Sequence, residues 1–144
     1  MKYREEIILQ RIKEMLTGRV NELLGEAEFQ IPPIEFGVPL GGFSAVPILR
    51  LAEYEQSEKE RIIRVDAYAL TLSLEVPKTP DSERDVYAYG AAISTALAED
   101  PTLGGVADRA VITGKKYVPP KKPYCGDCWE LIVTLRVTVE GITV

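Results

Sequence analysis

The chain has 144 residues, of which 46% are hydrophobic and 27% are charged, as is typical of one globular domain with its own core and not of a disordered chain. Its net charge of −5 argues against sequence-specific binding of nucleic acid, which usually requires a basic surface. The chain contains no histidine, which excludes Ser-His-Asp and Cys-His catalysis and removes the commonest general base and metal ligand.

Residues 2–25 are predicted to form an amphipathic helix, because apolar residues recur at steps of three and four with charged residues between them. The apolar positions are Ile8, Ile12, Met15, Leu16, Val20, Leu23 and Leu24. Gly25 marks the end of the helix, and Gly18 within it indicates a kink or a close contact. The apolar patch at the N-terminus is too short for a secretory signal, and no apolar run approaches the ~20 residues of a membrane span, so we expect neither.

Residues 30–47 are rich in proline and glycine, which argues against a helix or a central strand. The segment nevertheless carries several large apolar residues, including Phe36 and Phe43, and is too apolar for a free linker. Two interpretations remain open. The segment either lies across the core of its own subunit or is an arm that docks on a neighbouring subunit.

Residues 46–76 are predicted to form a β-hairpin. Its first strand is Ile48–Tyr54, the polar residues QSEKE turn the chain, and Arg61–Val76 form the second strand. One face of the second strand carries Tyr68, Leu70, Leu72, Leu74 and Val76, and the other carries Ala67, Ala69, Thr71 and Ser73. Because the second face is small and uncharged, we expect a helix or a partner subunit to cover it.

A second helix is predicted from Thr79-Pro80-Asp81 to Asp100. Thr79 suits the helix cap, Pro80 suits the first helical position, and Pro101 stops the helix. The predicted buried positions are Val86, Tyr89, Ile93, Ala96 and Leu97. The small residues Gly90, Ala91 and Ala92 leave room for a close approach to a sheet.

Residues 106–118 and 128–140 are predicted to be two further strands that pair as an antiparallel hairpin. The last strand alternates most regularly, and one of its faces carries Trp129, Leu131, Val133, Leu135, Val137 and Val139. At ~3.3 Å per residue it would span roughly 40 Å, which is longer than a small sheet needs and leaves room for a neighbour to add a strand.

The order helix, hairpin, helix, hairpin predicts an α+β fold, in which a four-stranded, mainly antiparallel sheet has two helices packed on one side. We expect a single domain over residues 1–144. It comprises the N-terminal helix at 2–25, the proline- and glycine-rich arm or loop at 30–47, and the sheet with the second helix at 48–141.

Cys125 and Cys128 form the one local motif that could bind a metal or carry out redox chemistry. Two cysteines at this spacing serve as half of a zinc site or as a redox disulfide. A structural zinc site needs four ligands, and the chain has no other cysteine. A redox pair normally opens a helix, whereas this pair precedes a strand. We therefore favour a loop with two reduced thiols and expect no metal or cofactor. A small binding module with a metal or redox site at these cysteines is the alternative.

Other charged groups have ordinary explanations. The acidic residues around 58–60, 81–85 and 99–100 suit a solvated turn and helix ends, so we expect no enzymatic carboxylate pair. A lysine loop surrounds two prolines and either meets phosphate or an acidic protein, or keeps a hairpin tip soluble. Its members are Lys115, Lys116, Lys121 and Lys122.

Three stretches resemble a known family: TALAEDPTLGGVADR at 95–109, ITG at 112–114 and the W-x-L-x-V-x-L-x-V strand at 129–137. They resemble the tail terminator and tail completion proteins of tailed bacteriophages and prophages, and the similarity covers residues 65–141. The proline- and glycine-rich segment and the cysteine pair are not features of that family.

In that family the subunit forms a ring, usually six-fold, at the head-proximal end of the tail tube, where it stops tube growth and meets the head connector. The resemblance implies a structural subunit without catalytic residues, whose partners are copies of itself, the tail-tube protein and connector proteins. It implies a location in the bacterial host cytoplasm during assembly and in the virion tail afterwards. The implied interface residues are Trp129, Leu131, Tyr68, Phe36, Phe43, Lys115, Lys116, Lys121 and Lys122.

Overall fold

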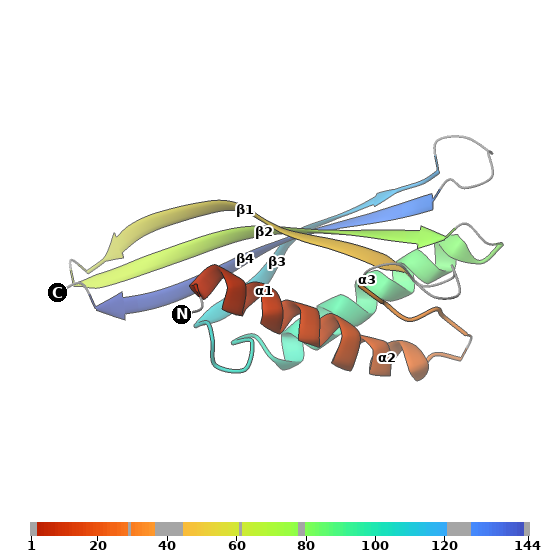
Figure 1. Ribbon diagram of the computed structural model, residues 1–144, viewed down its shortest axis with the longest axis horizontal. Coiled ribbons are helices and arrows are strands. Elements are labelled where there is room, and N and C mark those ends of the chain that lie inside the picture. Colours follow the sequence, from red (N-terminus) through yellow and green to blue (C-terminus); the bar gives the residue numbers. More distant parts are fainter. Residues whose placement is uncertain are drawn as a thin grey trace.

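The computed structural model describes residues 3–28, 30–36, 45–60, 62–77, 80–120 and 128–142. It confirms the predicted α+β class, because four strands form one antiparallel sheet and the helices lie against one of its faces (Figure 1). The helical segments are α1 (Arg4–Met15), a π-helical segment (Leu16–Val20), α2 (Asn21–Gly25) and α3 (Ser82–Glu99). The strands are β1 (Val46–Lys59), β2 (Ile63–Pro77), β3 (Arg109–Val118) and β4 (Cys128–Ile142).

The strand order is β1-β2-β4-β3, so each of the two predicted hairpins contributes one central and one edge strand. The central strands β2 and β4 are far apart in the sequence and pair along their whole length, from Ile63 opposite Ile142 to Pro77 opposite Cys128. Every neighbouring pair is antiparallel. The two edge strands, β1 and β3, therefore run in opposite directions.

The core lies between the sheet and the helices. The predicted apolar rows of both central strands face the helices and are buried: Tyr68, Leu70, Leu72, Leu74 and Val76 on β2, and Leu131, Val133, Leu135 and Val137 on β4. The five positions predicted for α3 are buried with them. Thr71 and Ser73 point to the opposite face of β2, as predicted, and are only partly buried.

The N-terminal helix is irregular in its middle. Its most buried residues recur at every fourth position: Ile8, Ile12, Leu16, Val20 and Leu24. A row with a period of four drifts around an α-helix of 3.6 residues per turn, and the wider π-helical turn corrects this drift. Gly18 lies in that turn, where the sequence indicated an irregularity. Nothing lies within 4 Å of the place where its Cβ would be, so no close contact requires a glycine.

The predicted turn QSEKE is wrong. β1 continues to Lys59, and the chain turns after it at Glu60, whose φ of 56° is left-handed. Polar residues indicated a turn, but this part of β1 is an edge strand that extends beyond the helices (Figure 1). Both of its faces meet solvent, so neither needs apolar residues. The start of the second helix is also wrong by two residues, since α3 begins at Ser82 and Pro80 precedes it.

The described parts of the proline- and glycine-rich segment lie against their own subunit. The Asn21 side chain donates a hydrogen bond to the carbonyl oxygen of Ile34 (3.0 Å) and accepts one from its N–H (2.8 Å). The Tyr89 hydroxyl donates to the carbonyl oxygen of Pro32. For residues 30–36 the structure therefore favours the first interpretation. Residues 37–44 lie outside the described residues.

The turn between α3 and β3 is built around Leu103. This leucine has a φ of 52°, which is uncommon for a residue with a side chain, and it is only 1% exposed. Gly104 and Gly105 follow with φ of 70° and 90°, a conformation that glycine adopts without strain. Burial of the leucine side chain thus holds the turn against the core.

Candidate assembly surface

No helix among the described residues covers the second face of the sheet (Figure 1). Short or mild side chains of the two central strands lie across it: Ala67, Ala69, Thr71, Ser73, Ile132 and Thr134. Ser73 donates a hydrogen bond to Glu130 Oε1 at 2.8 Å, and Thr113 donates to Thr134 Oγ1 at 3.0 Å. The β2 part of this face is small and uncharged, whereas Arg136 of β4 lies opposite Ala69 and Arg50 of β1 lies opposite Thr71 on the same face.

The sheet is longer than the helices that support it. β1, β2 and β4 have 14 or 15 residues, or about 50 Å at ~3.3 Å per residue, whereas the 18 residues of α3 span about 27 Å. The β1–β2 hairpin therefore stands clear of the helices (Figure 1), whereas the described end of the β3–β4 hairpin packs against α3 through Tyr117. The overhang of the β1–β2 hairpin is available to a neighbouring molecule.

Parts of the two sheet edges carry opposite charge, and the first half of β1 also carries the cation Arg50. β3 carries Arg109, Lys115 and Lys116 and no acidic residue; we call residues 109–116 the basic edge. The distal part of β1 and its turn, residues 53–60, carry four glutamates and one lysine; we call them the acidic edge. That lysine, Lys59, pairs with Glu140 at 3.6 Å. The glutamates Glu53, Glu55, Glu58 and Glu60 have no ion-pair partner among the described residues.

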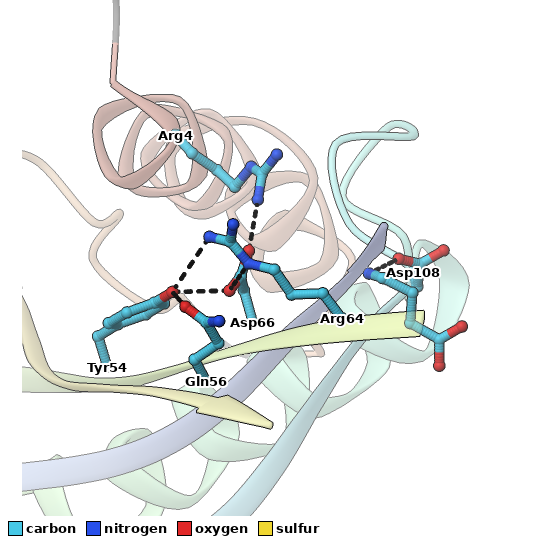
Figure 2. A network of polar contacts seen from close by, with 7 residues as sticks. Arg4, Tyr54, Gln56, Arg64, Asp66 and Asp108 are labelled. Atoms are coloured by element: carbon cyan, nitrogen blue, oxygen red, sulfur yellow. Dashed lines mark hydrogen bonds and ion pairs between the residues drawn. The ribbon is translucent and has the colours of Figure 1, made fainter. Parts of the chain in front are cut away.

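Figure 2 shows a polar cluster where α1 meets the β1–β2 hairpin. Its centre is Asp66, whose side chain is 5% exposed. Asp66 accepts hydrogen bonds from Arg4 Nη1 at 2.9 Å and from the Tyr54 hydroxyl at 2.7 Å. Arg64 Nε donates a third at 3.0 Å. The cluster therefore ties the start of α1 to both strands of the hairpin.

The partners of Asp66 keep its carboxylate ionised. Burial by itself raises the pKa of Asp66, but the hydrogen bonds from Tyr54 and Arg64 outweigh it and hold the pKa below its ordinary value. A carboxylate kept ionised in this way is a poor general acid at neutral pH.

Asp85 in the first turn of α3 is the second buried carboxyl group. Its Oδ1 has no hydrogen-bond partner among the described residues, and the nearest cation is Arg84, with Nε at 3.9 Å. Burial raises its pKa, and the negative charge of Asp81 adds to this against the effect of Arg84. No metal-binding group of three His, Cys, Asp or Glu side chains occurs within the described ranges.

Two hollows flank the C-terminal half of α3. One, of about 300 Å³, lies between α3 and the N-terminal helix and is lined by an ion pair in which Arg19 Nε is 2.7 Å from Glu99 Oε1. The other, of about 320 Å³, lies between α3 and β3, directly beside the basic edge. Its lining is small or aliphatic except for Arg109 and Ser94.

The residues that the sequence predicted at an interface differ in how deeply they are buried. Leu131 and Tyr68 are 0% and 3% exposed, so their side chains are part of the core and not of the surface. Trp129 and Phe36 are partly buried against the core. Lys13 Nζ lies 5.5 Å from the centre of the Phe36 ring.

The lysine loop and the cysteine pair are described only in part. Lys115 and Lys116 lie on β3, and Lys115 Nζ donates to the Gly90 carbonyl oxygen at 2.9 Å. Cys128 begins β4 and is partly buried. Four residues lie outside the described residues: Phe43, Lys121, Lys122 and Cys125.

Sequence reasoning missed two features of this surface. It missed the acidic edge, because the polar run was assigned to a turn. It also missed the Asp66 cluster. The available signal was alternation, since Asp66 shares the face of Tyr68 and Leu70, where a charged residue needs a partner.

A comparison with models of known protein families finds no match to this chain, and a comparison with curated protein sequences finds none either. Within the described ranges, no helix is both long and apolar enough to cross a membrane.

Proposed function

We propose that the chain is a structural subunit of a phage or prophage tail, of the tail terminator or tail completion type. The observation that carries the proposal is the sheet, whose long antiparallel strands have one uncovered face and two open edges (Figure 1). Association of copies buries such a face and such edges, and a closed ring leaves no edge free. The resemblance of residues 95–109 and 129–137 to the tail terminator family supports the phage tail as the place where the copies associate.

In this role the chain acts by assembly and has no catalytic step. Its partners are copies of itself, in a ring of the family's usual six, together with the tail-tube protein and the head connector. It is made in the cytoplasm of a bacterial host and remains in the virion tail. Asp66, which accepts hydrogen bonds from Arg4, Tyr54 and Arg64, supports a structural role because its bonds join α1 to the hairpin.

The test is the native mass of the purified chain over a concentration series, alone and with the tail-tube protein of the same phage. We expect a discrete multiple of 16.0 kDa, with six copies as the family's usual number. A chain that stays monomeric at every concentration and does not bind the tail-tube protein contradicts the proposal.

A further inference from the structure

We infer that copies of the chain join edge to edge, with β3 of one copy against β1 of the next, so that their sheets become one continuous antiparallel sheet. The inference rests on the proposed function, because it names the surface through which the ring closes. The partner is a second copy of this chain.

Charge is the first argument. Charged edges ordinarily protect a sheet against pairing, because like charges repel when two copies of the same edge meet. Here the acidic edge repels a second acidic edge, and the basic edge repels a second basic edge. The acidic edge attracts the basic edge, and both are open on the same molecule. The charges thus oppose a two-fold dimer through either edge and favour a head-to-tail contact, which generates a ring or a filament.

Strand direction is the second argument. Because β1 and β3 run in opposite directions, a second copy placed beside the first in the same orientation brings its β1 antiparallel to β3 of the first. The helices of both copies then lie on the same side of the joined sheet. The contact therefore continues the pattern within each copy and needs no change of fold.

Side-chain placement is the third argument. On β3, Arg109 and Lys116 share the uncovered face, and neither has a side-chain ion pair among the described residues. On β1, Glu53 and Glu55 share the same face. When the second copy stands level with the first, the register across the sheet brings Arg109 opposite Glu55 and Lys116 opposite Ile48, and a slide along the strand would be needed to bring Lys116 opposite Glu53. The hollow of about 320 Å³ between α3 and β3 leaves room on the other face for side chains of the incoming strand.

The test uses two full-length variants with reversed edges. Glu53→Lys with Glu55→Lys makes both edges basic, and Arg109→Glu with Lys116→Glu makes both edges acidic. Each variant alone is expected to lose the multimer, with the apparent dissociation constant rising at least about tenfold. In an equimolar mixture every contact again joins opposite charges, so alternating rings with an even number of copies are expected to re-form. Light scattering and native mass spectrometry measure both results.

The control is Glu26→Lys with Glu28→Lys, which changes the net charge by the same amount at two exposed positions beyond α2. It is expected to keep the wild-type multimer. Circular dichroism shows whether each variant is folded, and the single changes Glu53→Lys and Lys116→Glu replace any double variant that is not. About 1 M salt, where the Debye length is about 3 Å, is expected to weaken the wild-type multimer.

Three outcomes overturn the edge pairing. Multimers that persist in both variants overturn it and leave the proposed function standing, with assembly through another surface. Folded variants that lose the multimer but do not associate when mixed also overturn it. A wild-type chain that is monomeric at every concentration overturns it as well, and binding to the tail-tube protein then decides the proposed function separately.

Discussion

The hydroxyl of Tyr117 on β3 occupies the space that a Cβ on Gly90 of α3 would need. The ring of Tyr117 is further held by Tyr87, whose ring centre is 5.1 Å away at an interplanar angle of 73°. The carbonyl oxygen of Gly90 accepts the hydrogen bond from Lys115 Nζ. Gly90 is therefore the residue of α3 that contacts β3 most closely, through Tyr117 and Lys115.

Gly90→Ala is expected to destabilise the chain by about 1–3 kcal/mol, because a methyl group at this position displaces the Tyr117 ring. Urea unfolding measures the change. Adding Tyr117→Phe removes the clashing hydroxyl and should recover part of the loss, although the ring carbon Cζ would still be 3.2 Å from the new methyl group. An unchanged unfolding midpoint in Gly90→Ala would show that the close approach does not exist.

Gly18→Ala is expected to have the opposite effect. The position is helical and open, with nothing within 4 Å of the new Cβ. Alanine should therefore raise the free energy of unfolding by about 0.5–1 kcal/mol, because glycine loses more conformational entropy on folding. The same urea titration serves as the measurement, and a loss of stability would mean that the π-helical turn depends on this glycine.

Asp66→Asn is expected to lower the free energy of unfolding at pH 7 by about 1–3 kcal/mol, because hydrogen bonds to a buried charged group are lost. The lowered pKa of Asp66 gives the sign of the pH dependence. Its contribution is complete above the unfolded pKa of about 4 and disappears as pH falls through the lower folded pKa. Below both values the variant and the wild type should converge. A constant difference at all pH values would contradict the role of the charge.

Asp85→Asn is expected to stabilise the chain at neutral pH. Burial raises the pKa of Asp85, so the wild type loses stability as pH rises from the unfolded pKa through the folded one. The asparagine variant lacks this loss, and its advantage should vanish below about pH 4. Glu26→Gln, at an exposed position, is the matched control and should show neither effect. A less stable Asp85→Asn variant at pH 7 would mean that the ionised carboxylate has a partner.

Cys125→Ser with Cys128→Ser tests the alternative of a binding module. We expect the purified wild type to contain no stoichiometric zinc, and the double variant to keep the wild-type multimer and to lose less than about 1 kcal/mol of stability. Elemental analysis and thermal unfolding are the measurements. One zinc per chain or per pair of chains, lost in the variant together with stability, would favour the alternative.

Alternation in the sequence was sufficient to predict the sheet and its buried face, because β2 and β4 are covered on one side and need apolar residues only there. It did not show that β2 and β4 are neighbours, since alternation indicates which face is buried and not which strand lies alongside. It also failed at the far end of β1. An edge strand with solvent on both faces, such as Glu53–Lys59, has no pattern that separates it from a turn.

The candidate surface was predictable only in outline. The length of the last strand indicated an overhang, and the mild face of β2 indicated a covered surface. The opposite charge of the two edges depends on the strand order, which brings β1 and β3 to the two sides of one sheet. The contact of Arg4 with Asp66, 62 residues apart, likewise depends on how α1 crosses the hairpin.

The pairing of β2 with β4 also affects the rate at which the chain folds. The contact joins residues 63–77 to residues 128–142, with α3 and β3 between them. Such distant pairing has a high contact order and predicts slow folding. During synthesis the apolar row of β2 lacks one of its two flanking strands until β4 has emerged from the ribosome. Neither hairpin is therefore an independent folding unit, and removal of β4 leaves an aggregation-prone remnant and not a smaller domain.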